Sequence, residues 1–444
     1  MNIVLLSGGS GKRLWPLSND IRSKQFLKLF QRDDGTYESM VQRIYRQIRM
    51  VDEKANITIA TSKAQLSTLQ NQLQDKVNIC VEPSRRDTFP AIVLAAAYLR
   101  DEKDVQEDEP VIVCPVDPYV NEDYFQALKR LGALSGAGGA SLTLMGIEPT
   151  YPSEKYGYIL PENQGEKVSF VKAFKEKPDL ETAKEYIKAG ALWNGGVFAF
   201  RLKYLLEKSK EILGFQTYKE LYENYEKLEN ISFDYALVEK EQSIQVMSFS
   251  GQWKDLGTWN TLTEEMSEPV IGKGVLNEAC ENTYVINELN IPVLCMGLKD
   301  IIVSASGEGM LVTTREQSSY IKPFVDQFDQ TVMFAEKSWG SFRILAVEDE
   351  SLTIKVTLNA GHSMNYHSHE LRDEVWTITK GSAVAILDGK SRKVGPGEVL
   401  SIPTGCKHTI IAETPVQLIE VQLGKELNIL DKIKYDLEQE IEFE

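Results

Sequence analysis

The chain has 444 residues, a net charge of −16, 42% hydrophobic residues and 26% charged residues. These are ordinary globular values, so collagen, coiled-coil and disordered classes are excluded, and the length predicts two or three domains of roughly 150 residues each. The negative charge disfavours nucleic acid and anionic membranes and leaves small molecules as partners. The N-terminus lacks the basic start of a signal peptide, and apolar runs of about 18 residues are absent. We therefore expect a cytoplasmic protein.

Short apolar runs alternate with segments of helical period from residue 2 to about residue 249. This alternation predicts a parallel sheet flanked by helices. A further helix is expected to begin at Pro178, in its first turn, and to end at Ala189. The other predicted elements are strands at Ile3–Leu6, Ile57–Ala60, Ile79–Val81, Val111–Cys114, Leu142–Met145 and Val197–Phe200, and helices at Ser39–Arg49 and Ala91–Arg100.

The second half of the chain has a different pattern. Short β-rich pieces between about residues 268 and 323 predict a small β connector, and strands at roughly 8–12 residue spacing beyond Lys337 predict a β-sandwich or barrel. The tail 427–444 is expected to form a charged helix. Five scattered cysteines indicate reduced core thiols rather than a disulfide framework. The expected domain limits are 1–265, 266–335, 336–430 and 431–444.

A glycine-rich loop follows the first strand directly. Its glycines let the backbone approach a polyphosphate and direct N–H donors at it, and its basic residues form a cationic nest in an acidic protein. The loop lacks the Gly-Lys-Ser/Thr of a Walker loop. The alternative, a glycine turn with surface basic residues, is weakened by Lys24, a third cation close by. The candidate nucleotide-binding residues here are Leu6, Gly8, Gly9, Gly11 and Lys12, with Arg13 and Lys24 as catalytic candidates.

The stretch from Gly8 to Leu27 resembles the signature of sugar-1-phosphate nucleotidyltransferases, most closely the mannose-1-phosphate guanylyltransferase branch. Further motifs of that branch follow in the same order along residues 1–260. They are Glu82-Pro83, Arg86-Asp87-Thr88-Phe89-Pro90-Ala91, Pro115-Val116-Asp117, Tyr156-Gly157-Tyr158-Ile159, Glu176-Lys177-Pro178, Trp193-Asn194, Asp234-Tyr235-Ala236 and Trp253-Lys254-Asp255-Leu256-Gly257. The resemblance implies a Rossmann-like, GT-A-like α/β fold. It also implies an enzyme that makes GDP-mannose and pyrophosphate from GTP and mannose 1-phosphate.

The resemblance also implies a role for each matching residue. In-line attack on the α-phosphorus needs charge neutralisation and positioning rather than a covalent nucleophile. Mg²⁺ prefers few carboxylates plus phosphate oxygens, which suits Asp117 and Asp255. By the same resemblance, Arg13 would bind the leaving phosphates, Lys24 the phosphoryl centre and Lys177 the sugar phosphate. The sugar hydroxyls would contact Gly157, Glu176 and Asn194, and the base would contact Glu82, Arg86, Asp87 and Thr88.

Several positions depart from that pattern, among them Ser23, Arg85, Asp87 and Pro118, and most of these departures concern the base or sugar pocket. An alternative is therefore a pyrophosphorylase for another nucleoside triphosphate or hexose 1-phosphate.

A second constellation lies in the β-rich end. His367 and His369 point to one face of a strand because side chains alternate with period two, and Glu374 and His408 return on neighbouring strands. Three histidines and one glutamate suit Zn²⁺ or another divalent transition metal. The fourth histidine, His362, is expected in a loop. Three of only four histidines in one pattern are hard to ascribe to packing.

These two stretches resemble the paired motifs of cupins and, together with Trp339-Gly340-Ser341-Phe342, the type II phosphomannose isomerase domain. That resemblance implies interconversion of mannose 6-phosphate and fructose 6-phosphate, with Arg372 holding the phosphate of a hexose 6-phosphate. The alternative is a non-catalytic sugar-binding or dimerisation module. A homo-oligomer, most simply a dimer, is expected.

Overall fold

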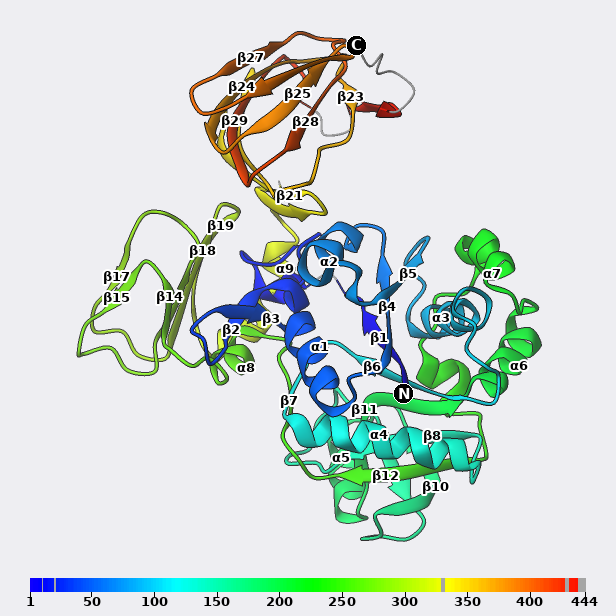
Figure 1. Ribbon diagram of the computed structural model, residues 1–444. Helices are drawn as coiled ribbons and strands as arrows, with labels where there is room; N and C mark the ends of the chain where they lie inside the picture. The colour runs from blue at the N-terminus through cyan, green and yellow to red at the C-terminus, as the bar shows by residue number, and fades with distance from the viewer. Residues whose placement is uncertain (10, 20, 329–331, 428–430, 438–444) are drawn as a thin grey trace.

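The computed structural model describes the chain except residues 10, 20, 329–331, 428–430 and 438–444. Three parts follow one another: an α/β domain, a β-rich connector beside it, and a β-barrel at the C-terminal end (Figure 1). The expected architecture of a nucleotidyltransferase-like sheet, a connector and a C-terminal barrel is confirmed. Among the described residues, no helix has the length and apolar character needed to cross a membrane.

A nine-stranded sheet forms the centre of the α/β domain. Its strands carry apolar side chains on both faces, and the first strand divides them between two cores: Ile3 and Leu5 pack into one, and Val4 into the other. The strand order is β5 (Asn78–Glu82), β4 (Asn56–Ser62), β1 (Asn2–Ser7), β6 (Pro110–Pro115), β11 (Leu192–Arg201), β8 (Leu142–Ile147), β12 (Ile244–Phe249), β10 (Val168–Lys175) and β9 (Tyr158–Pro161).

The expectation of a purely parallel sheet is wrong, because the sheet is mixed. Strands β1, β4, β5 and β6 pair in parallel, as do β8 and β12, but β11 runs antiparallel to both β6 and β8. Strand β10 is antiparallel to β12 and β9. A strand buried on both faces shows the same apolar run whichever way it points, so the apolar pattern does not reveal the direction of β11.

Helices cover both faces of the sheet. The first begins at Ser39, whose hydroxyl caps it reciprocally with Gln42, so the predicted start is correct to one residue. Residues of α1, α2 and α4 share a core with Ile3, and residues of α3, α6 and α7 share one with Val4. The helices are α1 (Met40–Val51), α2 (Leu66–Leu73), α3 (Thr88–Lys103), α4 (Glu122–Ala137), α5 (Leu180–Lys188), α6 (Leu202–Leu213), α7 (Tyr218–Asn224) and α8 (Trp259–Thr263).

Two short ribbons and five short helical turns complete the α/β domain. Helix α5 is capped by Asp179, whose carboxylate accepts from the backbone N–H of Thr182, so Pro178 precedes the helix instead of lying in its first turn. The ribbons are β2 (Lys28–Gln31) with β3 (Tyr37–Ser39), and β7 (Pro118–Val120) with β13 (Trp253–Asp255). The turns are η1 (Lys12–Leu14), η2 (Lys24–Phe26), η3 (Gln74–Lys76), η4 (Tyr225–Lys227) and η5 (Asp234–Val238).

The connector packs against the N-terminal segment. Arg22 makes a bidentate ion pair with Glu288, with N–O distances of 2.9 and 2.8 Å, and the hydroxyl of Ser306 donates to the carbonyl of Pro16 at 2.7 Å. Its strands are β14 (Val270–Gly272), β16 (Tyr284–Asn287), β18 (Ile301–Ser306) and β19 (Gly309–Thr314) in one sheet and β15 (Gly274–Leu276) with β17 (Val293–Cys295), followed by η6 (Gln317–Tyr320) and α9 (Lys322–Val325).

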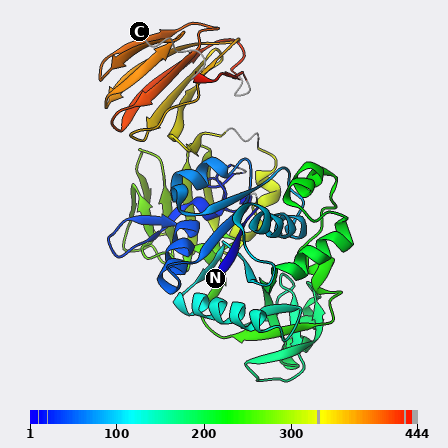
Figure 2. The ribbon, with the colours of Figure 1, turned by 45° about the vertical axis from the view of Figure 1, so that its right-hand side comes forward.

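The barrel consists of a six-stranded and a five-stranded sheet around an apolar core that includes Trp376. It joins the rest of the molecule through β20 and β21 (Figure 2), where the side-chain amide of Asn71 donates to the carbonyls of Lys337 and Gly340. The strands are β20 (Phe334–Lys337), β21 (Gly340–Val347), β22 (Ser351–Leu358), β29 (Val416–Leu423), β24 (Asp373–Lys380) and β27 (Val399–Ile402), then β26 (Lys390–Val394), β25 (Ala383–Leu387), β28 (His408–Ala412), β23 (His367–Ser368) and β30 (Ile433–Lys434).

The predicted tail helix is wrong for the part that the structure describes. Residues 433–434 form β30, which pairs with β23 at His367 and Ser368. The carboxylate of Asp431 accepts from the backbone N–H groups of Glu370 and Leu371 at 2.8 and 3.1 Å. Residues 428–430 and 438–444 of that prediction lie outside the described residues. The five cysteines are free thiols, as expected.

Candidate functional sites

The glycine loop between β1 and η1 lies directly against residues 23–24. Gly11 has a φ of +63°, and a Cβ there would lie 2.8 Å from the backbone nitrogen of Lys24, so only glycine fits. The hydroxyl of Ser18 donates to the Gly11 carbonyl and fixes the loop from the other side. The loop therefore brings Lys24 beside the backbone that the sequence assigned to phosphate binding.

Lys24 lies between two carboxylates. Its Nζ is 2.9 Å from Oδ2 of Asp117 and 3.4 Å from Oδ1 of Asp255. Asp117 follows β6, and the pairing of β7 with β13 puts Asp255 opposite Pro118, so two strand ends far apart in sequence meet here. Burial alone would lower the pKa of Lys24, but the two carboxylates raise it. Burial would likewise raise the pKa of Asp117, and Lys24 lowers it. These shifts favour the charged forms of Lys24 and Asp117.

Two cavities meet at the glycine loop and share Gly8, Gly9 and Asp117. The first, of about 320 Å³, contains the loop cations and both aspartates. The second, of about 330 Å³, contains most residues expected near the base. The predicted residues of the first are Gly11, Lys12, Arg13, Lys24 and Asp255, and those of the second are Leu6, Glu82, Arg86, Asp87 and Thr88.

Three residues of the second cavity make hydrogen bonds to the segment between α7 and η5. Oε2 of Glu82 accepts from the hydroxyl of Tyr225 at 2.8 Å, and burial raises the pKa of Glu82. Asp87 caps α3 and accepts from the backbone N–H of Thr88 at 2.7 Å. The hydroxyl of Thr88 in turn accepts from the backbone N–H of Phe233 at 2.8 Å, and Arg86 donates to the carbonyl of Glu226. The base-pocket candidates therefore lie together and are hydrogen-bonded to neighbouring residues.

The expected sugar residues form a separate cluster at the ends of β9, β10 and β11. The backbone N–H of Asn194 donates to the carbonyl of Gly157 at 2.8 Å, and Nζ of Lys177 lies 2.8 Å from Oε1 of Glu176. A Cβ at Gly157 would come within 2.4 Å of Oε2 of Glu176, so the glycine makes room for this carboxylate. Among the described residues, the buried Oε2 of Glu176 has no hydrogen-bond partner. An unsatisfied buried acceptor fits a hydroxyl donor from a ligand.

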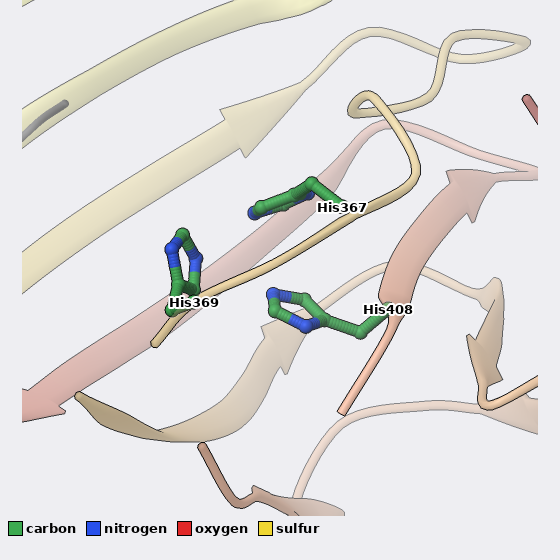
Figure 3. A group of neighbouring side chains, drawn as sticks. All are labelled: His367, His369 and His408. Atoms are coloured by element: carbon green, nitrogen blue, oxygen red, sulfur yellow. The ribbon is translucent and has the colours of Figure 1, made fainter. Parts of the chain in front are cut away.

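A histidine cluster lies inside the barrel. The register of β23 against β28 puts His367 opposite His408, and His369 follows one residue after β23. All three are buried, and their candidate ligand atoms lie within 4.8 Å of one another. Figure 3 shows the three rings turned toward one another. The exposed His362 lies in a loop outside the cluster, as expected.

Backbone carbonyls set the tautomer of each ring. Nδ1 of His367 donates to the carbonyl of Asn365 at 2.6 Å, and Nδ1 of His408 donates to the carbonyl of Cys406 at 2.9 Å. Nδ1 of His369 donates to the carbonyl of Asp431. Burial, followed by the electrostatic influence of Lys432, lowers the pKa of His367 to about 2. The neutral imidazole of His367 presents its Nε2 lone pair, as metal-bound histidines do.

Glu374 completes the polar lining of the cluster. Its Oε1 lies 3.0 Å from Nε2 of His369, and its Oε2 lies 3.4 Å from Nε2 of His408. Nε2 of His369 lies 3.1 Å from Nη2 of Arg372, and Oε2 of Glu374 accepts from Nε1 of Trp376 at 3.1 Å, whereas Nε2 of His408 has no hydrogen-bond partner among the described residues. A divalent cation would satisfy Nε2 of His408, and three histidines beside a carboxylate fit a transition metal. Arg372 is buried and donates to Oε1 of Glu374 at 3.0 Å.

Comparison with known proteins identifies the two domains that contain these sites. Residues 2–269 match the family model described as nucleotidyl transferase. The chain belongs to the nucleotidyl transferase family. Residues 354–422 of this nucleotidyltransferase match the cupin domain model, which confirms the expected C-terminal fold.

Relatives of similar length support the same grouping. The nucleotidyltransferase is 29% identical to a mannose-1-phosphate guanylyltransferase of Escherichia coli (strain K12), with 97% of each chain covered. It is also 29% identical to the mannose-1-phosphate guanylyltransferase ManC of Salmonella typhimurium, with 98% of this chain and 97% of the relative covered. The crystal structure of mannose-1-phosphate geranyltransferase from Thermus thermophilus superposes with a TM-score of 0.61 at 27% identity, covering 73% of this chain and 98% of that one.

Several residues of the nucleotidyltransferase sites were not predicted. Tyr225, which holds Glu82, lies in a segment without a recognisable pattern. Asp431 was assigned to a helical tail, yet its carbonyl orients His369. Lys322 of the connector lines the first cavity, and a lone lysine outside any motif carries no signal. Asp234 belongs to a quoted motif, and its Oδ1 accepts from the side-chain amide of Asn194 at 2.6 Å.

Asp234→Asn is expected to stabilise the nucleotidyltransferase at alkaline pH. Burial, and then the carboxylate of Glu176, raises the pKa of Asp234 to about 6. Because the folded-state pKa lies above the unfolded one, the ionised side chain opposes folding above about pH 6, by about 3 kcal/mol, and this cost falls as pH drops. Urea unfolding should show a gain from Asp234→Asn at pH 8 that shrinks to about half at pH 5.

The control is Asp179→Ala. The backbone N–H of Thr182 lowers the pKa of Asp179, so its contribution has the opposite sign and disappears in acid. A gain from Asp234→Asn that does not depend on pH would contradict the assigned burial cost.

Proposed function

We propose that the N-terminal domain transfers a guanylyl group from GTP to mannose 1-phosphate and releases pyrophosphate. The observation that carries this proposal is Lys24 held between Asp117 and Asp255 at the rim of the glycine loop, where two cavities meet. The names of the full-length relatives from Escherichia coli and Salmonella typhimurium support guanine and mannose as the base and the sugar.

The reaction needs a charged, positioned phosphate centre rather than a protein nucleophile. Asp117 and Asp255 would hold Mg²⁺, since two carboxylates in one cavity suit that ion. When bound, Mg²⁺ neutralises charge on the reacting phosphates. The ammonium of Lys24 stabilises charge at the phosphoryl centre, and the guanidinium of Arg13 binds the leaving phosphates. The N–H groups of Gly8, Gly9 and Gly11, with Lys12, orient the polyphosphate.

The remaining assignments follow the two other clusters. Glu82 and residues 86–88 bind the base, because they line the second cavity beside Leu6. Glu176, Asn194 and the backbone of Gly157 form hydrogen bonds with the sugar hydroxyls. Lys177 binds the sugar phosphate.

A pyrophosphate-release screen tests this function directly. The purified chain is assayed with each of the four nucleoside triphosphates against mannose, glucose and galactose 1-phosphates in Mg²⁺. GTP with mannose 1-phosphate should give the highest kcat/KM. A different best pair would overturn the proposed specificity, and no release with any pair would overturn the transferase activity.

Lys177→Ala should raise the KM for mannose 1-phosphate by about tenfold or more and leave the KM for GTP within about twofold. The ammonium of Lys177 is mostly exposed and pairs with Glu176, so removing it disturbs little of the fold. Steady-state kinetics with each substrate varied in turn measure the effect. The matched control is Lys184→Ala on the neighbouring helix, where Lys184 pairs with Glu181. A rise in the KM for GTP alone would contradict the assignment.

For the barrel, we propose a bound Zn²⁺ or similar divalent transition metal, held by His367, His369, Glu374 and His408. The favouring observation is the group of three buried histidines whose candidate ligand atoms lie within 4.8 Å of one another, with the Nδ1 atoms of His367 and His408 bound to carbonyls and Glu374 in contact with His369 and His408. The proposed activity is aldose–ketose isomerisation of a hexose 6-phosphate. A metal held by these residues would supply Lewis-acid chemistry at the substrate carbonyl, and Arg372 would orient the substrate beside Glu374.

A further inference from the structure

The connector reaches into the first cavity through one helical turn. Helix α9 (Lys322–Val325) lies against η1 of the glycine loop, as the yellow helix beside the dark-blue N-terminal segment in Figure 1 shows. Nζ of Lys12 is 2.9 Å from Oδ1 of Asp326, and the rings of Trp15 and Phe328 are 5.2 Å apart. Val325 is buried at this contact. These contacts fix α9 relative to the loop.

Lys322 is the connector residue that lines the cavity of about 320 Å³ beside Gly8, Gly9 and Gly11. Within the described residues, Lys322 makes no ion pair. Lys24, in contrast, is engaged by Asp117 and Asp255, and Lys12 by Asp326. In a chain of net charge −16, a cation at the wall of this cavity that makes no ion pair among the described residues is available for an anion.

The cavity has more cations than its acidic residues neutralise. Its lining carries Lys12, Arg13, Lys24 and Lys322 against the two aspartates, and a nucleoside triphosphate or pyrophosphate supplies the missing negative charge. Asp326 lies one helical turn after Lys322, on the same short segment, and holds Lys12 at the rim. One turn of the connector therefore supplies a cation to the cavity and orients a second one.

We propose that Lys322 binds the polyphosphate of the nucleotide substrate and of the pyrophosphate product, so that the connector completes the phosphate site of the α/β domain. This rests on the proposed function, because it names a further ligand group for the same substrate. Lys322 is a binding residue for the leaving phosphates and has no part in the sugar cluster, which lies at the ends of β9, β10 and β11.

The test compares Lys322→Gln with Lys322→Arg and with Lys299→Gln in the full chain. Lys299 is an exposed connector lysine paired with Glu281 at 2.9 Å, so it is a matched control for loss of charge. Lys322→Gln should weaken binding of pyrophosphate with Mg²⁺ by about tenfold in calorimetry and raise the KM for GTP by a similar factor. The KM for mannose 1-phosphate and the unfolding temperature should not change. Lys322→Arg should stay within about twofold of wild type.

The outcomes separate this inference from the proposed function. Equal pyrophosphate affinity in Lys322→Gln and wild type, or an equal loss in Lys299→Gln, overturns the role of Lys322 and leaves the transferase standing. A wild-type chain that binds pyrophosphate but forms no nucleotide sugar overturns the proposed function, while a selective loss in Lys322→Gln still supports the binding role. Failure of wild type to bind pyrophosphate overturns both.

Discussion

Asp117→Asn and Asp255→Asn should each lower kcat for pyrophosphate release by on the order of 10²-fold or more. Each carboxylate lies within ion-pair distance of Lys24, at 2.9 and 3.4 Å, and each lines the cavity assigned to the polyphosphate. An amide of the same shape keeps the packing but loses the negative charge that attracts both a divalent cation and the ammonium of Lys24. The loss should fall on kcat more than on KM, because it affects charge that develops in the transition state.

Asp123→Asn is the matched control, since Asp123 is an exposed acid in the first turn of α4, a few residues from Asp117. It should turn over like wild type at every Mg²⁺ concentration. Near wild-type kcat in either cavity variant under saturating Mg²⁺ would show that the two-aspartate assignment is wrong. Unfolding temperatures of all three variants distinguish lost chemistry from lost fold.

The two aspartates also show why this part of the site was predictable. A glycine loop, a strand end and a short motif each carry local backbone information, and Asp117 follows β6 as the sequence suggested. The meeting of Asp117 with Asp255 was expected only from the family resemblance. The physical cause, antiparallel pairing of β7 with β13, is a long-range contact that no local pattern reveals.

Strand direction and the C-terminal tail show the limits of the sequence. Strand β11 is buried on nearly its whole length and has the same apolar pattern in either direction, so its antiparallel place between β6 and β8 was missed. The charged tail has a composition typical of an exposed helix, but tertiary contacts override that local preference: Asp431 binds the backbone of Glu370 and Leu371, and β30 pairs with β23. The position of Lys322 was not predicted either, because only the contact of α9 with η1 brings it to the cavity.

In the barrel, the double substitution His367→Ala/His369→Ala should remove the metal from the chain. Wild type purified with Zn²⁺ should contain about one transition-metal ion per chain, and the double variant about none, since two of four ligands are gone. Elemental analysis by mass spectrometry measures this. His362→Ala is the matched control, because His362 is an exposed histidine of the same barrel whose Nδ1 contacts the carbonyl of Ala360 at 3.0 Å. It should keep the full metal content.

Equal metal content in the double variant and in wild type would refute the assignment of these ligands. In a coupled assay, the metallated wild type should convert fructose 6-phosphate to mannose 6-phosphate, and His408→Ala should abolish this conversion while pyrophosphate release in Mg²⁺ continues. The two activities should separate because the histidines lie in the barrel, whereas Asp117 and Asp255 lie in the α/β domain. If a fully metallated chain shows no isomerisation with any divalent metal, the barrel is a sugar-binding or assembly module, and the role of its metal is to hold β23 and β28 together.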